Sequence, residues 1–368
     1  MKSLDEKLNK IRTNKYKPTD FIIADAKDGE MGGGAQAPGP KKGETSSYKC
    51  YSEYLQAMRE MVKSGLVDVM LMSAYSAEIL FQEGCFIKSP VTAAVRLNDT
   101  TDIWGLRGSN YNSFPSKNVR TASLERVKEI ADLGLYSITF SNNVEKDVAS
   151  LQGLKDFQVE AVEKGIRYFL EVFNPQIDIK VDPKILPFYI NDCIVRCLSG
   201  SVSADRPLFL KIQYNGPEAM EELSNYDPGR LIIGILGSGK GTMRDTFELV
   251  RQAEKYGARV ALFGRKILLT ESPIKTVELM RRVVQKEIGS KEAVEVYHDF
   301  LKNEKNLRKK IVELTMSLDG SFSAEHGVGV TRKAELKKYK KDELNIMKSI
   351  KKSIDDKNIL NPGKIIDY

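Results

Sequence analysis

The sequence predicts an α/β fold, a (β/α)8 (TIM) barrel followed by a small, mainly helical C-terminal appendage. Eight apolar, β-rich runs recur along the chain, and amphipathic segments of helical period lie between them. Several runs are almost continuously hydrophobic, such as DVMLM at 68–72 and LIIGIL at 231–236, which is typical of parallel strands covered on both faces. Eight such units over about 270 residues match a barrel in number and size.

The elements are expected in the following order. The eight strands are placed at 21–26, 67–73, 91–97, 136–141, 167–173, 207–214, 230–236 and 258–263. Helices are expected at 51–64, 124–133, 147–163, 186–198 and 242–256, and several are expected to end at a glycine, among them Gly65, Gly134, Gly165 and Gly257. A doubly wound dinucleotide-binding sheet would need G-x-G-x-x-G after the first strand, where this chain has ADAKDG. The glycine-rich stretch at 32–34 and the AQAPGPKKGETSS that follows it, up to residue 47, are predicted to be a long surface loop.

Composition limits the classes of protein that fit. Of the 368 residues, 29% are charged and 41% hydrophobic, as in a soluble globular protein. No apolar run is long enough for a membrane span, and the charged N-terminus is unlike a secretory signal. Four cysteines make no disulfide framework and fit a cytoplasmic location. With two histidines, a three-histidine zinc site is impossible, and no metal is expected.

Three regions are predicted: an N-terminal extension at 1–17, the barrel at 18–302 and the appendage at 303–368. Helices are expected at 290–303 and 306–319, on either side of the last boundary. Residues 303–368 contain 15 Lys and Arg against 10 Asp and Glu. Because acidic residues interleave with basic ones, we interpret this segment as a solvated helical surface and predict no nucleic-acid partner.

Catalytic residues of a barrel of this kind gather at the C-terminal ends of its strands. Lys211 stands out because it lies within a run that is expected to be buried. Burial disfavours the charged ammonium, which makes the neutral, nucleophilic amine accessible near neutral pH for Schiff-base formation. An alternative with equal weight is a structural ion pair between Lys211 and Glu171 or Asp25.

The segments after strands 7 and 8 resemble a phosphate site, where glycines allow close backbone approach and a helix N-terminus faces the anion. The candidate residues are Gly237, Ser238, Gly239, Gly241, Thr242, Gly264 and Arg265, and Lys240 could add charge. A Walker loop would need Ser or Thr after Gly239-Lys240, where this chain has glycine, so NTP hydrolysis is not predicted. The alternative is a tight turn that only packs its glycines.

The segments PLFLKIQYNGP, LIIGILGSGKGT and VALFGRKI resemble strands 6 to 8 of short class I aldolases of the fructose-bisphosphate and tagatose-bisphosphate types. The resemblance implies that Lys211 is the Schiff-base lysine and that both loops bind phosphate. FIIADAKDGEMG is similar to strand 1 of these enzymes and implies an assisting role for Asp25 or Asp28, whereas LEVFNP implies that Glu171 is an acid/base.

The likeness spans about residues 18–302 and is closest to a little-characterised branch with ADAKD, VDVMLMS, NDTTDIW and GILG-x-x-x-GT. The chain departs from the family's usual pattern by KDG in place of D-H-G, a proline-rich loop at 35–40 and an insertion at 98–121.

The tail carries a second resemblance. GSFSAEHGVGVTRK and ILNPGKI look like the last sixty residues of FAD-linked oxidases of the glycolate oxidase and D-lactate dehydrogenase type. This implies flavin-oxidase-like roles for Glu325, His326 and Asn361. The flavin-binding domain of that family has no counterpart in residues 1–302. We therefore interpret the tail as a fusion remnant or docking appendage, with a partner chain that supplies an FAD domain as the alternative.

Together these features predict a class I, Schiff-base aldolase-like lyase that acts on a small phosphorylated carbonyl or sugar substrate without a cofactor. A cytoplasmic homo-oligomer with no membrane partner is expected. The alternatives are an FAD-linked oxidoreductase component, with FAD as cofactor, and a non-catalytic sugar-phosphate-binding barrel.

Overall fold

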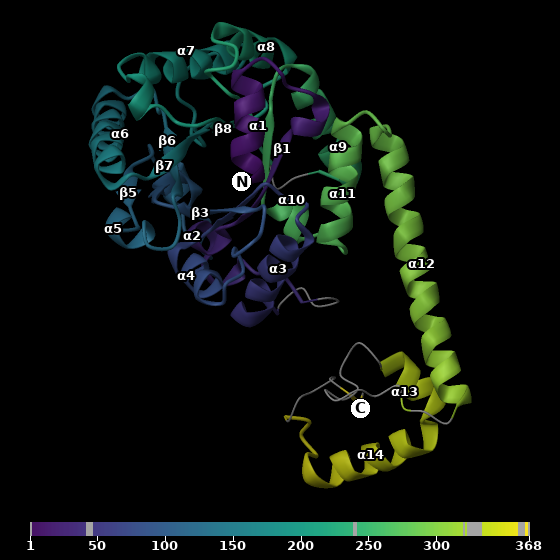
Figure 1. Ribbon diagram of the computed structural model, residues 1–368. Helices are drawn as coiled ribbons and strands as arrows, with labels where there is room; N and C mark the ends of the chain where they lie inside the picture. The colour runs from purple at the N-terminus through teal and green to yellow at the C-terminus, as the bar shows by residue number, and fades with distance from the viewer. Residues whose placement is uncertain are drawn as a thin grey trace. The chain divides into compact units, whose positions relative to one another are not determined.

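Eight parallel strands close into a barrel in the computed structural model, which confirms the predicted fold (Figure 1). The structure describes residues 2–41, 47–237, 241–318, 321, 333–359 and 365–366. The strands follow the order β1-β10-β9-β8-β7-β6-β3-β2 around the barrel. Their bounds are β1 Ile22–Lys27, β2 Val69–Met72, β3 Thr92–Arg96, β6 Leu133–Thr139, β7 Arg167–Phe173, β8 Leu210–Ile212, β9 Gly234–Leu236 and β10 Val260–Phe263. All eight lie within or overlap the predicted runs.

Apolar side chains fill the N-terminal half of the barrel interior. Ile22 and Ala24 of β1 belong to this cluster together with Phe169 of β7 and Phe209 of β8. The N-terminal segment joins it through α1 (Ser3–Arg12), whose Leu4, Leu8 and Ile11 are buried in the same cluster. The helix therefore covers the end of the barrel at which the strands begin.

Helices surround the strands on the outside (Figure 1). They are α3 Tyr51–Ser64, α4 Ala74–Gln82, α5 Leu124–Val127, α6 Val144–Lys164, α7 Leu186–Ser199, α8 Pro217–Tyr226, α9 Met243–Lys255, α10 Arg265–Leu268 and α11 Pro273–Val284. The predicted helix at 51–64 is confirmed to the residue. Its start is capped because the Glu53 carboxylate accepts the backbone N–H of Cys50 at 2.7 Å.

The prediction for residues 124–134 was partly wrong. Helix α5 ends at Val127, and β6 already begins at Leu133, so Gly134 lies in a strand and does not end a helix. A Cβ at this position would stand 2.1 Å from Cδ1 of Leu97. Glycine therefore serves close packing beside β3.

The insertion after β3 forms a two-stranded antiparallel ribbon of β4 (Asn98–Thr100) and β5 (Asn118–Arg120), with short 3-10 turns at Thr101–Ile103 and Tyr111–Ser113. It packs on the segment after β1, where the Gly105 N–H donates to the Gly32 carbonyl at 2.7 Å. That segment contains helix α2 (Gly29–Gly33) and a 3-10 turn at Gly34–Gln36, so the predicted surface loop is partly helical.

The chain divides into two compact units, Met1–Tyr297 and His298–Tyr368. Helix α12 runs without interruption over Ser290–Ser317, so the prediction of two helices there was wrong. Residues 303–306, NEKN, contain neither proline nor glycine, and nothing in them stops a helix. The second unit also contains α13 (Lys333–Tyr339) and α14 (Lys341–Ile354). Along the described ranges, no helix is both long and apolar enough to span a membrane.

Candidate active site at the C-terminal end of the barrel

Three of the four predicted catalytic residues meet inside the barrel, where the strands end. Lys211 of β8 and Glu171 of β7 form a buried ion pair, with 2.6 Å between Lys211 Nζ and Glu171 Oε1. The two residues are register partners on neighbouring strands, so the pairing follows directly from the sheet. Asp28, just after β1, completes the group through Arg96, which contacts both carboxylates.

Arg96, the last residue of β3, is the centre of this cluster. Its Nε lies 2.5 Å from Asp28 Oδ2, and its Nη2 lies 3.0 Å from Glu171 Oε2. Nη1 donates to the Ser137 hydroxyl at 3.0 Å, and that hydroxyl donates to Glu171 Oε2 at 2.8 Å. The guanidinium thus fixes two carboxylates whose strands lie on different sides of the barrel.

The charges of the cluster act against the effect of burial. Burial by itself would raise the pKa of Asp28, but the positive charges of Arg96 and Lys211 bring it below its ordinary value. Asp99 lies 3.5 Å from Arg96 Nη1, and burial raises the pKa of its carboxyl to about 6. The site therefore combines an ionised carboxylate with a second carboxyl that can change protonation close to neutral pH.

Asp25 does not belong to this group. Ile22 and Ala24 lie in the interior cluster, and side chains alternate along a strand, so Asp25 and Lys27 face the outer side of β1. There they form an ion pair of 2.5 Å that is almost inaccessible to solvent. Burial raises the pKa of Asp25, against the opposing effect of Lys27. Asp28, two steps further along the same alternation from Ala24, is the carboxylate of the first strand segment that reaches the site.

Arg96, Ser137 and Asp99 were not among the predicted catalytic residues. Arg96 and Asp99 stand at the end of the third predicted strand, so their position pointed to the site. Nothing in the sequence showed that Arg96 would bridge Asp28 and Glu171, because that contact depends on closure of the barrel.

The predicted phosphate residues lie at the ends of β9 and β10. Gly237 follows β9, Gly241 and Thr242 precede α9, and Gly264 and Arg265 follow β10. Ser238 and Gly239 lie outside the described residues. The N-terminus of α9 carries an internal acceptor, because Asp245 Oδ2 accepts the Thr242 N–H at 2.7 Å and its hydroxyl at 2.9 Å. A phosphate that used the Thr242 donors would have to displace this carboxylate.

Lys266 lies closer to this loop than the sequence indicated. A Cβ at Gly237 would stand 3.2 Å from Lys266 Cδ, so the lysine stem packs against the segment after β9. The side chain is buried, and burial lowers the pKa of its ammonium. Arg265, which we predicted as the phosphate cation, is exposed. Lys266 is thus a second cation at the same position in the barrel.

A separate polar group follows β1 and β2. Glu30 Oε1 accepts the hydroxyls of Ser73 and Ser76, the second at 3.0 Å, and the Ser76 hydroxyl is 2.8 Å from the Tyr51 hydroxyl. Burial raises the pKa of Glu30. This group adds a carboxyl and hydroxyls at the C-terminal end of the barrel.

Glu325, His326 and Asn361, predicted to act as in flavin oxidases, lie outside the residues that the structure describes. Within the described residues, no group of three or more His, Cys, Asp and Glu side chains is placed to hold a metal ion.

Solved structures with this arrangement of strands include several aldolases. An archaeal fructose 1,6-bisphosphate aldolase matches with a TM-score of 0.55 and 16% identity over 77% of this chain and 99% of its own. A fructose-bisphosphate aldolase from Slackia heliotrinireducens matches with a TM-score of 0.57 and 13% identity over 81% and 92%. The barrel is similar in fold to class I aldolases. At such low identities the likeness concerns the fold alone.

The C-terminal part matches a different family. The model for the C-terminal domain of FAD linked oxidases covers residues 290–365. D-lactate dehydrogenase of Archaeoglobus fulgidus is 39% identical over 71 residues, which are 19% of this chain and 16% of that protein. Glycolate oxidase subunit GlcD of Bacillus subtilis is 42% identical over 57 residues, 15% of this chain and 12% of that protein. The chain therefore spans less than a fifth of the length of these relatives.

Proposed function

We propose that the barrel is a Schiff-base lyase that makes or breaks a carbon–carbon bond in a small, phosphorylated carbonyl compound. The observation that carries this proposal is the position of Lys211. Its amine is buried at the C-terminal end of the barrel, 2.6 Å from a carboxylate that can accept its proton. The similarity in fold to class I aldolases supports the same reaction class.

In the proposed reaction, Glu171 takes a proton from the Lys211 ammonium, and the neutral amine attacks the substrate carbonyl carbon. Glu171 returns this proton to the carbinolamine hydroxyl, which leaves as water and gives an iminium ion. Glu171 or Asp28 then removes the proton of the hydroxyl group β to the iminium carbon. The carbon–carbon bond breaks, its electron pair forms an enamine, and the fragment that carries the former hydroxyl oxygen leaves as a carbonyl compound, the first product. Protonation of the enamine and hydrolysis of the resulting iminium release the second product and restore Lys211.

Phosphate on the substrate would lie between the segments after β9 and β10. Arg265 and Lys266 are the cations at this place, and the Thr242 N–H at the start of α9 would contribute only if the phosphate displaced Asp245. A substrate whose phosphate is held there would be oriented with its carbonyl carbon over β8, where Lys211 lies.

Borohydride trapping tests this function. The protein is incubated with dihydroxyacetone phosphate and a panel of sugar phosphates, reduced, and analysed by intact mass and peptide mapping. We expect an adduct of substrate mass on Lys211 and none on Lys27, a buried lysine on the outer face of β1. Lys211→Met must abolish the adduct and turnover. Folded protein that binds phosphate compounds without an adduct would instead favour the sugar-phosphate-binding barrel.

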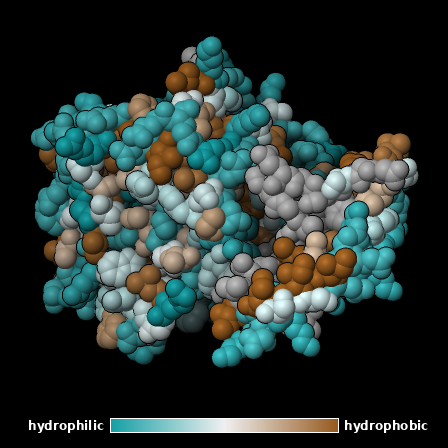
Figure 2. Space-filling view, turned by 90° about the horizontal axis from the view of Figure 1, so that it is seen from below, coloured by the Kyte–Doolittle hydropathy of each residue, from teal (hydrophilic) through white to brown (hydrophobic). Residues whose placement is uncertain are grey.

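A second candidate function, an FAD-linked oxidoreductase component, is supported by the family match at 290–365. One face of α12 packs on the other helices of the C-terminal unit through Val312, Met316, Leu336 and Leu344. Large aliphatic residues outside this small core are 54–73% exposed: Leu307, Ile311, Leu314 and Leu318 on α12, and Ile346, Ile350 and Ile354 on α14. Hydrophobic residues are also exposed in the space-filling view of Figure 2.

Such a surface supports docking to another chain. The matched relatives carry more than four fifths of their length outside the shared segment, so the proposed partner is a chain that carries the flavin-binding part of such an oxidase. Purified protein that absorbs in the flavin band, or whose addition quenches FAD fluorescence, would favour this candidate. Colourless protein that leaves FAD unchanged would refute flavin binding by this chain alone, and failure to bind the flavin-loaded part of such an oxidase in a pull-down would refute the docking candidate.

A further inference from the structure

A pocket of about 710 Å³ lies at the end of the barrel opposite Lys211 and Glu171. It is formed where β7 and β8 begin, between the C-terminal ends of α1 and α6 and the turn before β9. Its volume is in the range of small-molecule sites. Four arginines line it, Arg12, Arg167, Arg206 and Arg230, and no acidic residue does.

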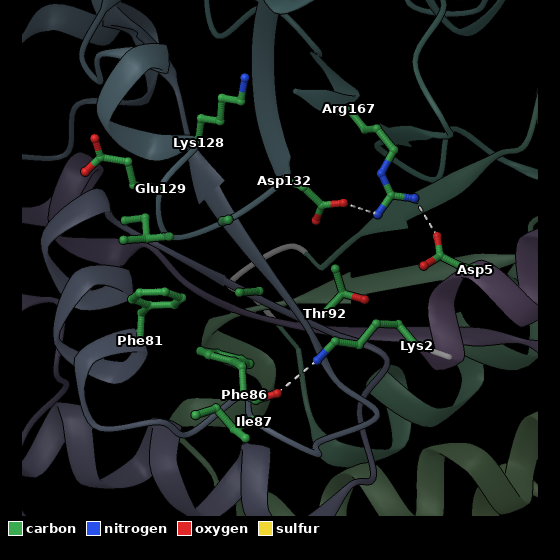
Figure 3. A pocket seen from close by; sticks show the side chains of 13 residues that line it. Lys2, Asp5, Phe81, Phe86, Ile87, Thr92, Lys128, Glu129, Asp132 and Arg167 are labelled. Atoms are coloured by element: carbon green, nitrogen blue, oxygen red, sulfur yellow. Dashed lines mark hydrogen bonds and ion pairs between the residues drawn. The ribbon is translucent and has the colours of Figure 1, made fainter. Parts of the chain in front are cut away.

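Two of the arginines are held in place by carboxylates outside the lining. Arg167 Nη1 lies 2.5 Å from Asp5, and Nη2 lies 2.6 Å from Asp132 (Figure 3). Arg206 Nη1 lies 3.5 Å from Asp227. A guanidinium has five N–H donors in a fixed plane, so each of these arginines keeps donors for a further acceptor.

The other two arginines have no such partner. Across the described ranges of the chain, neither Arg12 nor Arg230 has a carboxylate within 4.0 Å or a side-chain hydrogen bond. The charge of nearby Arg167 adds to burial in lowering the pKa of Arg12, as expected where cations crowd together. Among the residues that the structure describes, Arg12 and Arg230 have no carboxylate partner, and they lie in the same pocket as Arg167 and Arg206, which do. The pocket therefore has an excess of positive charge.

Backbone packing brings Arg12 and Arg230 together from opposite parts of the sequence. A Cβ at Gly229 would stand 3.7 Å from the Arg12 carbonyl oxygen, and Gly229 has a φ of +82° that disfavours other residues. The turn before β9 therefore lies directly on the end of α1. Apolar side chains, among them Ile166, Pro207 and Leu208, form another part of the lining.

We infer that this pocket is a second binding site, distinct from the mouth of the barrel, for a small molecule that carries a phosphate group. Unpaired guanidinium groups suit a doubly charged, multidentate anion, and the apolar lining suits the carbon skeleton to which the phosphate is attached. A depression of about 410 Å³ beside it shares Arg167 but mixes Lys2 and Lys128 with Asp5, Glu129 and Asp132 (Figure 3). That neighbouring depression lacks the excess of positive charge.

The test is isothermal titration of the full chain with inorganic pyrophosphate. The pocket variant is Arg12→Ala/Arg230→Ala, both residues being exposed enough to leave the core intact. Arg126→Ala/Arg308→Ala removes the same charge from exposed helix positions elsewhere, and Arg265→Ala affects the proposed substrate-phosphate site. Circular dichroism and the melting temperature check that each variant is folded.

We expect the pocket variant to weaken pyrophosphate binding about tenfold or more, and the exposed-arginine control to leave it unchanged. The Arg265→Ala protein should keep this binding. Titration of glucose 6-phosphate and of glucose, read in the same way, tests for the phosphate-bearing carbon compound, and only the first should bind through the pocket. Absence of binding in the unmodified chain, equal loss in the control, or loss in Arg265→Ala alone would overturn the inference.

Discussion

Replacing Arg96 by methionine keeps most of the side-chain volume and removes the cation at the centre of the barrel cluster. Arg96 lies 2.5 Å from Asp28 and 3.0 Å from Glu171. Without it, Glu171 keeps Lys211 and the Ser137 hydroxyl, whereas Asp28 loses its direct ion pair. The variant therefore leaves inside the barrel a carboxylate that has lost its direct ion-pair partner and keeps only the more distant charge of Lys211.

The expected loss of stability at pH 8 is about 3–5 kcal/mol, the usual cost of removing one member of a buried ion pair. The loss must depend on pH in a definite direction. In the unmodified protein, Arg96 and Lys211 hold the pKa of Asp28 below its ordinary value, so Asp28 stabilises the fold above the pKa of the unfolded chain. In the variant, burial raises the folded-state pKa. Each unit by which it then exceeds the pKa of the unfolded chain costs about 1.4 kcal/mol at a pH above both values.

Urea unfolding followed by circular dichroism at pH 8 and pH 5 measures this. The difference between variant and unmodified protein should be smaller at pH 5, because Asp28 takes up a proton there. Arg59→Met removes a partly exposed ion pair with Glu83 and should cost about 1 kcal/mol or less. An equal effect of Arg96→Met at both pH values, or an effect as small as that of Arg59→Met, would refute the reasoning.

Three further predictions concern the fold. Gly234→Ala should destabilise the protein by about 3 kcal/mol, because a Cβ at this position would stand 2.4 Å from a backbone carbonyl oxygen of β8. The control is Gly200→Ala, where a Cβ would meet nothing within 4 Å in the described part of the chain. Similar melting temperatures of the two variants would contradict this prediction. Asp68→Asn should cost about 3 kcal/mol at pH 7, because Arg281 and Lys7 lower the pKa of the buried Asp68 carboxylate. The difference should become smaller as the pH falls below the ordinary carboxyl pKa, and urea unfolding at pH 7 and pH 3 with no such decrease would argue against it. Lys27→Met should destabilise the protein more than the double variant Lys27→Met/Asp25→Asn, since only the single variant leaves a buried carboxylate without its partner. If calorimetry gave the double variant the lower melting temperature, the ion pair between Asp25 and Lys27 would have to lie in solvent.

Much of the architecture could be predicted because it is encoded locally. The apolar runs at 68–72 and 167–173 specify buried strands, and the pattern at 51–64 specifies an amphipathic helix that the structure matches residue for residue. Lys211 could also be found in this way, because a lysine within an apolar strand is conspicuous in any sequence. Glu171 could be identified from the resemblance of the segment LEVFNP alone. Its ion pair with Lys211 could be anticipated because their strands, β7 and β8, follow each other along the chain and pair in the barrel.

The choice between Asp25 and Asp28 required the tertiary structure. Strands that are apolar on both faces carry no polar alternation from which to identify the inner face, so both carboxylates remained candidates. Only closure of the barrel shows that Ala24 points inward and that Asp25 pairs with Lys27 on the outer side. The same holds for Lys266, which shares a short helical turn with Arg265 but lies on its buried side.

The sequence by itself determined the class of fold, the order of its elements and the lysine on which the proposed chemistry depends, because each is written in consecutive residues. The tertiary structure alone decided which charges share a site. Arg96 reaches Glu171 across the barrel, and Arg12 lies beside the turn that carries Arg230. Such contacts join residues that are remote along the chain, and they form only when packing of the apolar core has closed the barrel and fixed α1 over its end.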